Sequence, residues 1–128
     1  IKVRSKEQNT TIGDFITSRK IKISTLDEYC LNNKINQIDL LKIDTQGYED
    51  KVLQGSKYNL ESNIIKAIVT EIMFDNVYDK YFSFSDIEKF IAPNDFRMVG
   101  VYLTGNNLFD NLTFFADVCY LNKNYYDL

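Results

Sequence analysis

Short apolar runs alternate with polar and amphipathic stretches from Ile23 to Leu121, and this alternation predicts strands separated by helices. The run Ile38–Ile43 is short and has β-branched residues at both ends, which favours a buried strand over a helix. A second run with the same character lies within Ile64–Phe74. The first two-thirds of the chain therefore contain two predicted buried strands.

Helix signals fall before and after the first of these strands. Thr25 and Glu28 have the spacing of a capping box and predict a helix over Leu26–Asn33. A second helix is predicted over Tyr48–Gln54, and Gly55 is well placed as its left-handed C-terminal cap. Strand and helix thus alternate in the way that parallel sheets require.

The last part of the chain predicts one more helix and an antiparallel pair of strands. Ser85 and Glu88 form a second capping box, and Pro93 ends that helix. The apolar runs Arg97–Leu103 and Leu112–Leu121 are separated by a polar stretch, which is typical of antiparallel neighbours.

These elements predict an α/β fold. We expect a partial Rossmann-like sheet of about four strands, mostly parallel, with one antiparallel strand near the C-terminus and helices on both faces. Residues 1–22 are polar and predict a lead-in loop or an edge segment. Residues 23–121 form the α/β unit, and residues 122–128 form a tail.

Composition narrows the functional classes. The 128 residues are 45% hydrophobic and 26% charged, as in a soluble single domain, and the net charge of −3 provides no general basic surface for nucleic acid. No apolar run approaches the roughly 20 residues of a membrane span. The two cysteines do not form a disulfide framework, so a cytoplasmic location is the simplest prediction.

The chain has no histidine, and this absence limits its possible chemistry more than its charge and hydrophobic content do. Histidine-based triads and histidine–zinc sites are excluded, and two cysteines are too few for an all-cysteine zinc site. No metal site is predicted. Any chemistry must rest on carboxylates, lysines, tyrosines, amides and backbone groups.

Two acidic residues stand at the predicted carboxyl ends of strands, where open α/β sheets bind ligands. Asp44 follows the first strand, and it is either a functional group or a cap of the next helix. Glu71 lies near the end of the second strand and could simply pair with Lys42 or a loop amide. Lys42 alternates within the first strand and needs a carboxylate partner if buried, either Glu49 or Glu71.

The stretch Ser24–Tyr29, followed about ten residues later by IDLLKIDTQGYEDKVLQG and then by Ile68–Ile72, resembles the FkbM family of methyltransferases. The resemblance implies a Rossmann-like sheet of seven strands, the last one antiparallel. It also implies methyl transfer from S-adenosylmethionine to a hydroxyl of a small molecule or glycan. The family's glycine-rich cofactor loop and its ribose-binding acid are not found here, so the sequence resembles the C-terminal half of the domain.

The same resemblance implies roles for particular residues. Asp44 would be the catalytic residue and would lie nearest the cofactor's methyl group or the acceptor, with Gln46 also at the cofactor. The residues that would brace the site are Lys42, Glu49 and Glu71. Two positions depart from the family pattern, because Gln46 replaces the usual glutamate and Tyr48 the usual small residue.

Two other functions remain open. The chain could be a non-catalytic α/β module for binding or assembly, because half a sheet exposes the edge of Ile38–Ile43 and could form a homo-oligomer there. It could also be an unrelated nucleotide or phosphate binder that uses the turn at Gly47, although no phosphate loop of the GxGxxG type is found.

Overall fold

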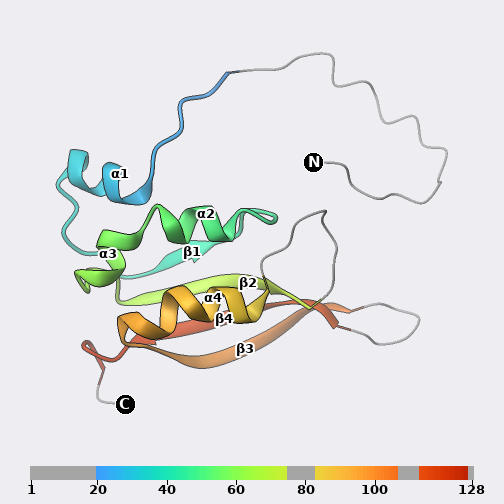
Figure 1. Cartoon of the computed structure of the whole chain (residues 1–128). Helices are drawn as coiled ribbons and strands as arrows, with labels where there is room; N and C mark the ends of the chain where they lie inside the picture. Colours follow the sequence, from blue (N-terminus) through green and yellow to red (C-terminus); the bar gives the residue numbers. More distant parts are fainter. Residues whose placement is uncertain (1–19, 75–82, 107–112, 127–128) are drawn as a thin grey trace.

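The computed structural model describes residues 20–74, 83–106 and 113–126, and it shows one sheet with helices packed on it (Figure 1). Most of the predicted lead-in, residues 1–19, and the end of the tail, residues 127–128, lie outside the described residues. The elements in chain order are α1 (Leu26–Asn33), β1 (Leu41–Ile43), α2 (Glu49–Gln54), α3 (Lys57–Glu61), β2 (Ala67–Met73), α4 (Phe84–Ile91), the 3₁₀ turn η1 (Ala92–Asn94), β3 (Phe96–Asn106) and β4 (Thr113–Asn122).

The sheet has four strands in the order β1-β2-β4-β3. β1 pairs with β2 in parallel, while β4 is antiparallel to both β2 and β3. The prediction of a mostly parallel sheet is therefore wrong. β4 is the single reversed strand, but it lies between two others, so two of the three pairings are antiparallel.

The core lies between the sheet and the helices. Ile68 of β2 and Val118 of β4 are completely buried, and so are Leu53 of α2 and Ile87 of α4. These side chains belong to one cluster, and Leu60 of α3 joins it. Helices α2, α3 and α4 thus gather on one face of the sheet, whereas the sequence predicted helices on both faces. At about 25 cal/mol per Å² of buried apolar surface, this cluster provides the main stabilisation of the fold.

The helix ends follow the predicted chemistry in part. The hydroxyl of Thr25 accepts the N–H of Glu28 at 3.1 Å and caps α1 as predicted, although the carboxylate of Glu28 binds the hydroxyl of Ser24 at 2.7 Å. The second capping box lies two residues earlier than predicted. It joins Ser83 to Asp86, whose carboxylate accepts both the N–H and the hydroxyl of Ser83.

The prediction that Gly55 ends a helix in the left-handed conformation is wrong. Its φ is −78°, and the chain continues into α3, a helix that the sequence analysis missed. A long-range contact caps α3, because the carboxylate of Asp27 in α1 accepts the N–H groups of Tyr58 at 2.9 Å and Asn59 at 3.0 Å. Gly55 allows this close approach, since a Cβ there would lie 3.1 Å from the Cβ of Thr25.

Candidate functional site

The candidate site is built on the loop of residues 44–48 between β1 and α2. Gln46 has a φ of 57° and Gly47 a φ of 97°, so two consecutive residues are left-handed and the chain turns sharply after the strand. Glycine adopts this conformation without strain, whereas the left-handed conformation of Gln46 destabilises the loop by roughly 1 kcal/mol. The tight turn predicted at Gly47 is present.

Glu49, the first residue of α2, holds this loop in place. It is only 2% exposed. One carboxylate oxygen accepts the N–H and the hydroxyl of Thr45, both at 2.9 Å, and the other accepts the N–H of Gly47 at 3.1 Å. The buried charge is therefore compensated by three donors from the loop, which fixes the path of the chain after β1.

Asp44 and Lys42 form an exposed pair next to the loop. Their side chains are 45% and 55% exposed, and Nζ of Lys42 lies 3.5 Å from Oδ2 of Asp44. Gln46 donates from its side-chain amide to the other oxygen of Asp44 at 3.4 Å. Two structural roles considered from the sequence, a buried pairing for Lys42 and a helix cap for Asp44, are wrong. Lys42 is not a buried partner of Glu49 or Glu71, and Asp44 does not cap α2, whose N-cap Tyr48 makes no side-chain cap bond.

Glu71 faces the same end of the sheet from β2. Ile43 pairs with Thr70, so Asp44 and Glu71 each lie one residue further along neighbouring parallel strands. On its other side, Glu71 pairs with Asp117 of β4. The carboxylates of Asp44, Glu71 and Asp117 therefore follow one another across the sheet, and Tyr102 of β3 pairs with Asp117 and continues the row.

Electrostatics distinguish Glu71 from its neighbours. Partial burial raises the pKa of Glu71 most, and the negative charges of Asp44, Glu49 and Asp117 raise it further, while Lys42 opposes them. The carboxylate of Glu71 also receives no hydrogen bond or ion pair from the residues that the structure describes. The expected pairing of Glu71 with Lys42 or with a loop amide is therefore wrong.

Asp117 is the residue of this row that the sequence analysis missed. It is half-buried in a strand whose neighbours are mostly apolar, Phe115 and Val118 among them. A lone carboxylate in such a strand was the available signal. Its position beside Glu71, however, depends on the register of two strands that are far apart in the sequence.

The row provides hydrogen-bond acceptors and negative charge at the open end of the sheet. Such a set suits hydroxyl donors and cationic groups, and it repels anions. Among the described residues, no group of three or more histidine, cysteine, aspartate or glutamate side chains is arranged to hold a metal ion. Carboxylates arranged in this way can accept protons and orient polar ligands.

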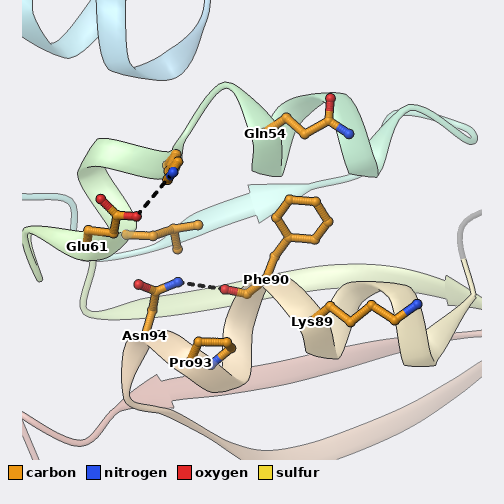
Figure 2. A pocket seen from close by; sticks show the side chains of 8 residues that line it. Gln54, Glu61, Lys89, Phe90, Pro93 and Asn94 are labelled. Carbon is orange, nitrogen blue, oxygen red and sulfur yellow. Dashed lines mark hydrogen bonds and ion pairs between the residues drawn. The ribbon is translucent and has the colours of Figure 1, made fainter.

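A separate groove of about 530 Å³ lies between α2–α3 and α4–η1, on the helix-covered face (Figure 2). Lys57 and Glu61 form an ion pair of 3.7 Å along one wall, and the amide of Asn94 donates to the carbonyl of Phe90 at 2.7 Å along the other. None of the site residues predicted from the sequence lines this groove.

Comparison with known protein families gives one match. The model described as "Methyltransferase FkbM domain" matches residues 2–98, which is more than half of the chain and includes the loop of residues 44–48. Searches among curated proteins and among solved structures found no match. No helix in the described part of the chain has both the length and the apolar character needed to cross a membrane.

Proposed function

The chain belongs to the FkbM methyltransferase family, and on this premise we propose that its strand-end carboxylates serve methyl transfer from S-adenosylmethionine to a hydroxyl of a small molecule or glycan. The observation that carries the proposal is the position of the family-matched loop. It places Asp44 beside Glu71 at the carboxyl ends of two parallel strands, where open α/β sheets bind ligands.

The residues of this end fit the cofactor chemically. S-adenosylmethionine would supply a methyl group activated by a positively charged sulfonium. The carboxylates of Asp44 and Glu71 carry the opposite charge and leave the open end of the sheet negative. The Rossmann-like fold of this family is consistent with the observed sheet, whose last strand is antiparallel.

The chain's own residues then divide the remaining work. Glu49 fixes the loop, so that Asp44 is held at a set position relative to β2. Asp44 accepts a hydrogen bond from the acceptor hydroxyl and aligns its oxygen with the methyl carbon, which is the main contribution that an enzyme makes to this reaction. Lys42 pairs with Asp44 across 3.5 Å and limits the directions that this carboxylate can take.

Calorimetry with S-adenosylmethionine tests cofactor binding by the full chain. A second assay measures S-adenosylhomocysteine release with methyl glycosides of glucose, galactose and mannose as acceptors. We expect binding and release, and we expect Asp44→Asn to lower turnover sharply without changing the fold. The control is Asp39→Asn, a carboxylate paired with Lys66 outside this site. No binding and no release would contradict the proposed function.

A second candidate function is assembly through β1. This strand has only three ladder residues and forms one edge of the sheet, with the exposed Leu40 beside it. Unpaired edges can add a strand from another chain. Sedimentation analysis of the chain and of Leu40→Lys tests it, and a dimer that the variant dissociates would favour assembly.

A further inference from the structure

We propose that Glu71 is the proton acceptor of this site and that Asp44 orients the acceptor hydroxyl. The inference rests on the proposed function and deepens it, because the two carboxylates take different roles. The division follows from their surroundings, which differ in burial, in partners and in the charges that face them.

Glu71 is a half-buried carboxylate without a compensating donor. A partly buried carboxylate is normally matched by hydrogen bonds or a cation, because its desolvation is unfavourable. Among the described residues, Glu71 forms no ion pair, and the hydroxyl of Thr70 donates to its backbone carbonyl rather than to its carboxylate. No structural reason for an acid at this position is found, so a functional reason is favoured.

Asp44 differs on each of these points. It is 45% exposed, and it contacts both the ammonium of Lys42 and the side-chain amide of Gln46. Its negative charge is therefore already compensated, which suits a group that accepts a hydrogen bond and holds a direction. An uncompensated carboxylate is the better proton acceptor, because protonation relieves its unfavourable interactions.

The charged groups around Glu71 support this division. Asp44 and Lys42 face it from β1 and the following loop, Glu49 from α2, and Asp117 from β4. Burial and the three carboxylates raise the pKa of Glu71, and Lys42 opposes them. A base with a raised pKa binds a proton more strongly, provided that it is ionised when the reaction begins.

The reaction balances with Glu71 in this role. The acceptor oxygen forms a bond to the methyl carbon as the carbon–sulfur bond breaks, and the electron pair of that bond stays on sulfur. The hydroxyl proton passes to a carboxylate oxygen of Glu71. Glu71 then releases the proton to solvent, which its partial exposure permits.

The first test needs neither cofactor nor acceptor. Carbon-13 NMR of the side-chain carboxyl of Glu71 in the full chain should give a titration midpoint above that of an ordinary glutamate. Asp117→Asn and Asp44→Asn should each lower this midpoint, because each removes a neighbouring negative charge. The control variant Glu61→Gln changes an exposed acid on α3 and should leave it unchanged. A midpoint at or below the ordinary value would overturn the proposal.

The second test separates a base from a residue that only supports the structure. Glu71→Gln keeps the shape of the side chain but cannot take the proton, so we expect kcat to fall about 100-fold or more with little change in the KM for S-adenosylmethionine. Glu71→Asp should recover part of the rate, and Glu61→Gln should retain all of it. NMR spectra of each variant verify the fold.

The outcomes of the two proposals are distinguishable. Failure of the wild-type chain to release S-adenosylhomocysteine would contradict the proposed function, whatever the titration of Glu71 shows. Wild-type release that survives Glu71→Gln undiminished would contradict only the assignment of the base.

Discussion

The polar side chains at the two ends of the β2–β4 pair differ in whether they have hydrogen-bond partners. At the end where β4 stops, the buried amide of Asn122 donates to Oδ1 of Asn63 at 3.2 Å and to the carbonyl of Ile65 at 3.1 Å, and its own oxygen accepts the N–H of Asn124. At the other end, Glu71 lies between two carboxylates and receives no donor among the described residues.

The difference separates polar residues that stabilise the fold from polar residues that indicate another role. The network at Asn122 is closed, because Tyr125 also donates to the carbonyl of Asn63 at 2.7 Å and each group meets a partner. Its purpose is to hold the chain after β4 against the chain before β2. The row at Glu71 is open and like-charged, which destabilises a strand pair and indicates a role other than stability.

The largest effect is expected from Glu49→Ala. The change removes an acceptor from three donors of Thr45 and Gly47 in a part-buried loop, so the free energy of unfolding should fall by about 3 kcal/mol. Urea denaturation measures it, with the exposed Glu61→Ala as the control. A loss as small as that of the control would mean that the loop holds its shape without this acid.

Asn122→Ala should be next, with a loss of about 2 kcal/mol. The carbonyl of Ile65 and the N–H of Asn124 both lose a partner, and unsatisfied buried groups are costly. Asn32→Ala on the exposed surface of α1 is the matched control in the same denaturation assay. If both variants unfold at the same urea concentration, the contrast between the two ends is wrong.

Asp27→Ala should cost about 1.5 kcal/mol, because α3 loses the cap that α1 provides. Asp27→Asn should cost less, since the remaining amide oxygen can still accept one N–H. Hydrogen exchange of the amides of Tyr58 and Asn59 measures the loss locally. Unchanged protection of both amides in Asp27→Ala would argue against the cap.

Glu71→Gln should have the smallest effect on stability and the opposite sign, a gain of about 0.5 kcal/mol at neutral pH, because it relieves the partial burial of a charge and the repulsion between like charges. The pKa of Glu71 is raised in the folded state, so its protonated form stabilises the fold at low pH. That contribution is lost as the pH rises through the folded pKa. The gain should therefore grow as the pH rises, and urea titrations at several pH values measure it. A gain independent of pH would mean that Glu71 does not titrate as described.

Local patterns were enough to predict the positions of β1 and β2 and the turn at Gly47, because apolar periodicity and positive φ depend on neighbouring residues. The place of β4 between β2 and β3 was not predictable in this way. Its pairing depends on contacts between strands that are far apart in the sequence, and that information is spread over the whole chain.

The same limit explains what was missed at the site. Asp44 and Glu71 were predictable because the first follows a strand and the second lies near the end of one, but Asp117 joins them only through the register of β4 on β2. Helix α3 was missed for a related reason. Its capping acid is Asp27, which is 31 residues before Tyr58, so no local signal marks the start of the helix.

The buried carboxylate of Glu49 at the start of α2 also limits which ligands the turn at Gly47 can bind. A phosphate cradle needs backbone N–H groups that are free to grip an incoming oxyanion. Here the N–H groups of Thr45 and Gly47 already grip a carboxylate that belongs to the chain itself. The carboxylate of Glu49 thus occupies the place of a bound anion. A nucleotide's phosphates would have to displace this buried carboxylate before they could bind the same N–H groups.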